Sequence, residues 1–349
     1  MTPLDLYRSN FSNRTSLRYN ARMPRDATRL TAAALLAAGL LAASVWTAWP
    51  GRAQLPRPPA RFPSGIYYIR PHGDRPGGVL TRLGGNVGFT LNLPPNGFDL
   101  RPNKLVYTLD SAIHLVDPSG EDFVMVIPSL SHMAFPSFSP DGRKITVQAI
   151  DDQDPGNLNI YVIDLDTSHI TQVSRLPGSE VRPEWSPTDQ RVAYTSVDPQ
   201  EVDLHIYDLT NHHDSPVVRF AMTNHLTFMP EGREVLDPRS LRRFDVRTGR
   251  TTRALGEAVR LALLGQGFMI DGREPGRLSG GACPMDGDVS PDGRHVVVDC
   301  AVQRDGRSGV ILVEVSEDAA LVDVLTDILP VNPAYSDHHS FSQTNPAWL

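Results

Sequence analysis

A turn motif that recurs along the chain is the strongest constraint on the fold. It reads Pro-Ser-Phe-Ser-Pro-Asp-Gly-Arg at 136–143 and Ser-Pro-Asp-Gly-Arg at 290–294, with weaker copies at 100–104, 183–190 and 228–233. Its prolines are 38, 47, 43 and 61 residues apart, at positions 102, 140, 187, 230 and 291. A repeat of about 40–50 residues has the length of one β-propeller blade.

The chemistry of the motif predicts a tight hairpin turn at each copy. Proline fixes φ, aspartate bonds its own backbone, and glycine accepts positive φ. A β-rich run follows the turn, as at 144–147 and 191–195. A second strand with the pattern Ile-Tyr-x-x-Asp-Leu then leads through a polar turn into one more short strand. Its copies lie at 112–117, 159–165, 203–209, 241–246 and 309–314.

Each repeat therefore supplies four antiparallel strands. The sequence predicts an all-β fold, a six-bladed β-propeller of four-stranded antiparallel blades over 65–349, preceded by one N-terminal hydrophobic helix. Residues 65–83 match only the outer hairpin of a blade, and residues 345–349 match only an inner strand. Together they would form a composite sixth blade that seals the ring, with three strands as the alternative to four.

The Pro-x-aromatic-Ser-Pro-Asp-Gly turn and the Ile-Tyr strand together resemble the TolB-type propeller repeat, which also occurs in prolyl-oligopeptidase-like hydrolases. The resemblance covers 65–349, with its best copies between 134 and 210. It implies partner binding through the propeller faces, such as docking onto a lipoprotein or a larger envelope complex. It assigns no catalytic residue, because the matching residues build turns and strands. An ordinary β-sandwich is the alternative fold, and it leaves the spacing unexplained.

An uncharged and mostly apolar segment occupies 30–49. Twenty helical residues span roughly 30 Å, the thickness of the hydrocarbon core of a bilayer. Residues 1–29 carry six arginines against two aspartates, which predicts a cytoplasmic N-terminal region and an exported, periplasmic remainder. Trp46 and Trp49 are then expected at the far membrane interface.

Two alternatives for this segment stay open. It is either a retained membrane anchor or a signal peptide cleaved after Ala53, for which Met23 would be a natural start. A buried core helix is disfavoured by the Arg- and Pro-rich flanks. Residues 50–64 are proline-rich and predict a semi-rigid linker between this segment and the propeller.

The charge balance argues against a nucleic-acid partner. The net charge is −7, and since residues 1–29 contribute +4, the remaining residues carry −11. A basic surface that could hold phosphates is therefore not expected.

The two cysteines are predicted to form a disulfide within one blade. Cys283 and Cys300 flank the turn at 290–293 symmetrically, so a hairpin places them opposite each other or one residue out of register. An exported compartment permits oxidation. The alternative is two buried small hydrophobic residues.

Other polar groups give weaker signals. The pairs His212–His213 and His338–His339 could bind a metal, but adjacent strand residues point to opposite faces, so solvated loops are the expectation. The acidic stretch 151–157 lacks the distal glutamate of a calcium loop. We expect no metal site, no cofactor and no catalytic residue, because nucleophile-elbow, phosphate-loop and zinc-protease motifs are missing from the sequence.

These observations favour a non-catalytic, exported interaction scaffold that binds other proteins at the membrane, for example as an accessory subunit of a membrane-embedded or envelope complex. The bilayer is a further partner if residues 30–49 are retained. The alternative is a propeller hydrolase or lyase, or a binder of a small ligand such as a glycan or a metal, which uses the central channel. The long interval at 256–288 is the irregular part of the repeat. It is either a connection that carries function or, as we favour, a degenerate blade strand with a longer loop.

The disulfide can be tested by titrating thiols in the denatured, unreduced protein. We expect no reactive thiol before reduction and two afterwards. Two free thiols before reduction would show that Cys283 and Cys300 are not bonded to each other.

Overall fold

The computed structural model describes much of the chain after residue 60. The described residues are 61–72, 77–85, 87–94, 97–109, 111–173, 175–198, 202–220, 226–238, 240–254, 277–278, 286–304, 307–316, 322–326, 329–330 and 346–349. They belong to the second of two compact units, Met1–Arg57 and Pro58–Leu349. The predicted helix at 30–49 lies outside them, and no helix in the described part could span a bilayer.

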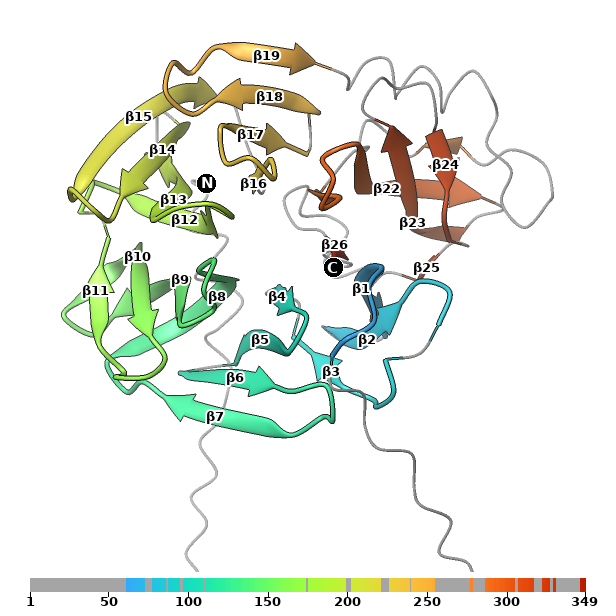
Figure 1. Ribbon diagram of the computed structural model, residues 1–349, viewed down its shortest axis with the longest axis horizontal. Coiled ribbons are helices and arrows are strands. Elements are labelled where there is room, and N and C mark those ends of the chain that lie inside the picture. The colour runs from blue at the N-terminus through green and yellow to red at the C-terminus, as the bar shows by residue number, and fades with distance from the viewer. Residues whose placement is uncertain are drawn as a thin grey trace, which may run out of the picture. The chain divides into compact units, whose positions relative to one another are not determined.

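Six antiparallel sheets form the blades of a propeller (Figure 1). In each blade the strands follow one another from the inner strand outward. Blade 1 contains β26 (Ala347–Trp348), β1 (Ile66–Pro71), β2 (Gly78–Arg82) and β3 (Asn92–Leu93). Blade 2 contains β4 (Phe98–Arg101), β5 (Lys104–Leu109), β6 (Ala112–Val116) and β7 (Asp122–Val126). Blade 3 contains β8 (Leu130–Phe138), β9 (Lys144–Asp151), β10 (Asp154–Asp164) and β11 (Ile170–Gln172).

Blades 4 and 5 repeat this order, and blade 6 varies it. Blade 4 contains β12 (Ser179–Trp185), β13 (Arg191–Val197), β14 (Val202–Asp208) and β15 (His213–Phe220). Blade 5 contains β16 (Thr227–Phe228), β17 (Glu234–Asp237), β18 (Arg242–Asp245) and β19 (Thr251–Ala254). In blade 6, β20 (Arg277–Leu278) and β21 (Gly287–Val289) both pair with β22 (His295–Arg304). Its outer strands β24 (Val322–Val324) and β25 (Leu329–Pro330) both pair with β23 (Arg307–Ser316).

The predicted six-bladed propeller is confirmed, and blade 1 is composite as expected. The order of its strands differs from the prediction: residues 66–70 form the second strand rather than the start of an outer hairpin, because β1 pairs directly with β26 through Ile66↔Trp348 and Tyr67↔Ala347. Burial explains the difference, since the first four residues of β1 are all buried, whereas an outer strand has an exposed side. The two-residue strand β3 completes four strands, so the three-stranded alternative is wrong.

The hydrophobic core is divided among the six junctions between neighbouring blades. Val106 of β5 and Ile145 of β9 lie in one cluster, and Ile160 of β10 and Trp185 of β12 lie in the next. The middle strands of a blade therefore bury both faces, as the run of buried residues in β9 shows. This two-sided burial explains why these strands read as nearly continuous apolar runs rather than as an alternation.

The recurring motif folds as a turn in which serine and aspartate bond each other. In blade 3, the Ser139 hydroxyl donates to Asp141 Oδ1 (2.6 Å), and the same oxygen accepts the Arg143 backbone N–H (3.0 Å). Gly142 has a φ of +64°, which favours glycine. Blade 6 repeats these contacts at the corresponding positions. The hydrogen bond from Ser139 is the main reason that the pKa of Asp141 lies below its usual value.

Side chains three residues before the turn proline link the inner strands of successive blades. Asp99 Oδ2 in β4 accepts the Phe138 N–H of β8 (2.6 Å). Ser137 Oγ in β8 accepts the Trp185 N–H of β12 (3.0 Å). A backbone N–H that faces a neighbouring blade thus finds its acceptor in that blade. In both cases the acceptor is the side chain three residues before the turn proline.

The seam that closes the ring uses this position as well. Asp288 Oδ2 of β21 accepts the Trp348 N–H of β26 (2.7 Å). Gly65 and Leu349 exchange two backbone hydrogen bonds, each 3.0 Å long. Trp348 also packs against the cluster between blades 6 and 1, and Leu349 packs against the cluster between blades 1 and 2.

The end of the predicted linker is part of this packing. The Phe62 side chain is only 4% exposed, and its ring meets that of Tyr67 edge to face with centroids 6.4 Å apart. The Phe62 N–H donates to the Pro102 carbonyl of blade 2 (2.7 Å). Residues 61–64 therefore lie against blades 1 and 2.

Replacing Asp288 should weaken the seam. Asp288→Ala leaves the Trp348 N–H without its carboxylate acceptor, which should lower the free energy of unfolding by about 1–2 kcal/mol. Hydrogen exchange at Trp348 and Leu349 should become faster. Asp152→Ala, in the exposed β9–β10 turn, is the control. Equal stability of both variants and unchanged exchange at β26 would contradict the prediction.

The turn aspartates should make the stability depend on acid pH. The Asp141 carboxylate is held in its charged form, so its contribution is complete above the unfolded-state pKa near 4 and is lost as pH falls through the lower folded-state pKa. Asp141→Asn should lower the free energy of unfolding by about 1 kcal/mol at pH 7. The effect is no larger because solvent screens the charge of this exposed carboxylate. Urea unfolding from pH 7 to about pH 3 should show this difference shrinking. A difference that is constant with pH would refute the proposed charge effect.

Candidate functional site

Two neighbouring inner strands hold non-glycine residues in the left-handed conformation. His132 and Phe135 of β8 have φ values of +53° and +52°, and Arg182 of β12 has +55°. The strand pairing shifts register at the same places, which marks β-bulges. Such strain costs about 1–3 kcal/mol per residue and concentrates at functional sites. These three residues, together with Gln148 and Glu180, form what we call the bulge cluster.

The bulge cluster joins blades 3 and 4. The Arg182 guanidinium carbon lies 4.3 Å from the centre of the Phe135 ring, a cation–π contact. The Arg182 backbone N–H donates to Oε1 of the buried Gln148 (2.8 Å). The fully buried Glu180 accepts the Leu176 N–H (2.8 Å) and the Ile160 N–H (3.3 Å).

The bulge cluster combines a buried carboxylate with two side chains that are not fully buried. The carboxylate of Glu180 is buried and holds two backbone donors, so it fixes the chain at the blade junction. His132 is exposed and Phe135 is half-buried, and both belong to a bulge that re-aims side chains. The cluster therefore presents an aromatic ring and an imidazole at the inner strands of a rigid scaffold.

The repeat motif itself contains the signal for these bulges. Phe135 precedes Pro136, and Arg182 precedes Pro183, at equivalent positions of two repeats. Proline cannot donate a ladder hydrogen bond, so inside a sheet it is confined to edges and bulges. The spacing of the repeats alone does not predict bulges at these prolines, so the bulge cluster was not identified from the sequence.

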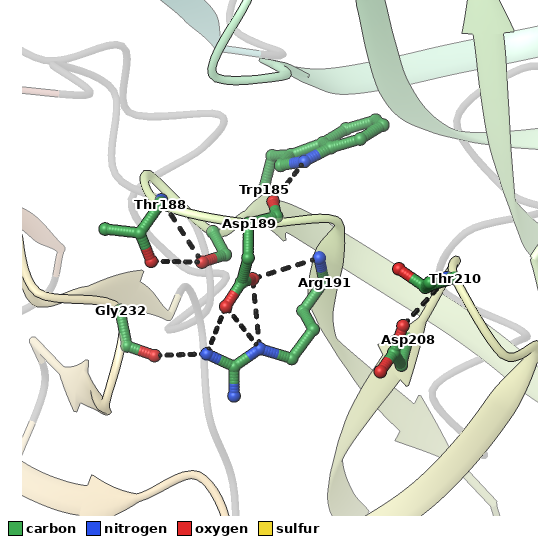
Figure 2. Close-up of polar contacts among 8 residues, drawn as sticks. Trp185, Thr188, Asp189, Arg191, Asp208, Thr210 and Gly232 are labelled. Atoms are coloured by element: carbon green, nitrogen blue, oxygen red, sulfur yellow. Dashed lines mark hydrogen bonds and ion pairs between the residues drawn. The ribbon is translucent and has the colours of Figure 1, made fainter.

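A second contact between blades lies at the turns, where blade 4 meets blade 5 (Figure 2). Arg191 pairs with Asp189 (Nη2 to Oδ2, 2.5 Å) and donates to the Gly232 carbonyl of the next blade (2.7 Å). Gly232 has a φ of +67°, which favours glycine, and a Cβ atom there would also lie 2.2 Å from Thr188 Oγ1. Burial tends to raise the pKa of Asp189, but hydrogen bonds from Arg191 and Ser186 outweigh it, and the pKa is lowered.

The corresponding basic residue of blade 2 behaves in the same way. Lys104 donates from Nζ to the Gly142 carbonyl of blade 3, and its ammonium lies 5.2 Å from the centre of the Phe138 ring. Burial lowers the pKa of Lys104, although Asp166 and Asp141 oppose this effect. Both cations therefore connect one blade to the next.

Histidines in two blades are engaged by tyrosine and aspartate. In blade 2, His114 stacks on Tyr107 (centroids 4.5 Å apart), and its Nδ1 lies 2.8 Å from Asp122 Oδ2. Burial, reinforced by Asp122, raises the pKa of Tyr107 to about 12. Blade 4 repeats the arrangement on the equivalent strands with Tyr194, His205 and Asp214.

The predicted disulfide lies only partly within the described residues. Cys300 is fully buried on β22, between the residues that pair with β21 and those that pair with β20. Cys283 is outside the described residues, and so are the predicted interface residues Trp46 and Trp49. The disulfide and the membrane-interface positions remain predictions.

The histidine pairs and the acidic stretch show no metal site where they are described. His212, in the β14–β15 turn, hydrogen-bonds through Nδ1 with the Tyr207 hydroxyl (3.2 Å), and His213 begins β15. Asp151 accepts the Gln153 N–H within the β9–β10 hairpin (2.7 Å). His338–His339 lies outside the described residues. Within the described ranges, no three His, Cys, Asp or Glu side chains are placed to hold a metal ion.

Comparison of the sequence with known proteins finds a partial relative, a TolB protein. No protein-family model matches the chain. The Tol-Pal system protein TolB of Alcanivorax borkumensis is 31% identical over 120 residues, which are 34% of this chain and 24% of that protein. The match thus spans about a quarter of the relative's length.

A similarity in structure covers more of the chain. The crystal structure of TolB from Acinetobacter baumannii superposes with a TM-score of 0.54 and 20% identity, over 83% of this chain and 67% of that chain. At this identity the likeness concerns the fold. Together with the repeated turns and the closed ring of six blades, it shows that the chain has a six-bladed β-propeller fold similar to that of TolB.

Proposed function

We propose that this chain is an exported, non-catalytic scaffold that binds another protein of the cell envelope, and that the bulge cluster is part of its binding surface. The observation that carries the proposal is the strained conformation of His132, Phe135 and Arg182 on adjacent inner strands. Strain of this kind persists where the surrounding structure enforces it, and a rigid propeller provides such a frame.

The chemistry of the described residues supports binding over catalysis. Glu180 holds backbone donors, and His114 of blade 2 and His205 of blade 4 are each paired with an aspartate inside their own blade. The relative from Alcanivorax is described as a component of the Tol-Pal system, which fits a role that depends on other proteins. Export is inferred from the basic and apolar residues 1–49.

Site-directed photo-crosslinking in the native envelope tests the proposal. A photoreactive residue at the exposed position 132 should yield one defined protein adduct. The same residue at the exposed position 251, on the outer strand of blade 5, should not. Phe135→Ala should reduce the adduct at 132 while the thermal unfolding of the protein stays cooperative.

Two results would refute this function. One is the absence of a protein adduct at 132, and the other is an equal set of adducts at 132 and 251. Recovery of the protein from the cytoplasmic fraction would separately refute export.

A further inference from the structure

The outer strand of blade 2 is an apolar edge with an exposed surface. Phe123, Val124 and Val126 of β7 are 56%, 53% and 64% exposed. Among the described strands only β6 pairs with β7, and Figure 1 shows β7 at the rim of the ring. An edge with free backbone donors and acceptors is a template for a further strand.

The other outer strands lack one or more of these properties. Strands β3, β11, β24 and β25 have two or three residues each, and β19 carries Thr251, Thr252 and Arg253. The outer strand β15 contains a proline, Pro216, opposite His205. In blade 2 the residue opposite the equivalent His114 is Val124. Blade 4 thus has an edge-protecting proline at the position where blade 2 has a valine.

The backbone pattern shows which groups of β7 face outward. The backbone N–H of Asp117 donates to the Glu121 carbonyl (3.0 Å), and the backbone N–H of Ile127 donates to the Ser111 carbonyl (2.9 Å). Because antiparallel pairs alternate, Phe123 and Met125 bond to β6. The N–H and C=O groups of the other three residues point away from the blade, and these residues are Asp122, Val124 and Val126.

The outer edge of β7 can pair with the same edge of a second copy of the chain. When two copies of β7 pair antiparallel about Val124, Val124 faces Val124 and Asp122 faces Val126, so three pairs each exchange two hydrogen bonds and all the outward groups are satisfied. Phe123 lies opposite Met125, a favourable aromatic–sulfur pair. No like charges meet across the junction, and Asp122 Oδ2 already lies within hydrogen-bond distance of His114 Nδ1 (2.8 Å).

We propose that β7 is a homodimer interface, at which two copies of this chain join their second blades into one continuous sheet through antiparallel pairing centred on Val124. The partner is a second copy because this register satisfies every outward backbone group of the strand and keeps the two Asp122 carboxylates apart. The interface lies on the outer strand and does not involve the bulge cluster.

Pro216 of blade 4 shows that a proline fits at the position equivalent to Val124, so Val124→Pro is the variant for the test. Val124→Pro removes one outward N–H and leaves the bonds to β6 in place, so the blade should fold. Sedimentation of the full-length protein over a concentration series should show a monomer–dimer equilibrium. Val124→Pro should weaken dimerisation by more than about tenfold. Val124→Ile, which keeps the N–H and the apolar side chain, should dimerise like the unmodified chain.

Thr251→Pro is the matched control, because it places a proline on the outer strand of blade 5 and should leave the dimer intact. A chain that is monomeric throughout overturns the proposal, as does a dimer unaffected by Val124→Pro or equally weakened by Thr251→Pro. Hydrogen exchange on the unmodified chain decides the matter if Val124→Pro does not fold. Protection of the Val124 and Val126 amides that rises with concentration supports the interface, and rapid exchange at all concentrations overturns it.

Discussion

The structure depends on the fact that each blade can cover its hydrophobic faces only with its two neighbours. The middle strands are buried on both sides, and every core cluster is shared between adjacent blades. One missing contact in the ring would expose two faces at once. The hydrogen bond from Trp348 to Asp288 and the packing of Trp348 and Leu349 are therefore needed by all six blades, although they involve few residues.

A single position of the repeat connects this packing with the backbone of the inner strands. Asp99, Ser137 and Asp288 stand three residues before a turn proline, and each accepts an N–H from the next blade along the ring. Lys104 and Arg191 make the corresponding links at the turns. Because several links run from one blade to the next in the same direction, the repeat encodes contacts between blades as well as the blades themselves.

The sequence was sufficient to predict the propeller because its signals are local. Ser139, Asp141 and Gly142 specify a turn within a few residues, and the spacing of such turns gives the number of blades. The outer strand β3 was missed because two residues show no periodicity. The place of β1 in its blade depends on β26, which is distant in sequence, and a local pattern cannot show that pairing.

The bulge cluster was beyond prediction for a related reason. Its contacts join residues of two repeats, such as Phe135 with Arg182, and a repeat pattern shows what the copies share rather than what neighbouring copies do to each other. The prolines after these residues did carry a signal for irregular strands. Histidine pairing was similarly hidden, because His114 and Asp122 meet only when β6 and β7 are side by side.

The composite blade also determines how the propeller would respond to mechanical load. Residues 61–65 enter the ring beside Leu349, where Gly65 and Leu349 are hydrogen-bonded to each other. Tension between the preceding segment and the carboxyl terminus would act on the short β1–β26 pair and would peel it open one bond at a time. Phe62 packs against Tyr67 and is hydrogen-bonded to Pro102 of blade 2, so blades 1 and 2 would share this load, and the two-residue strand β26 limits the resistance of the ring to pulling.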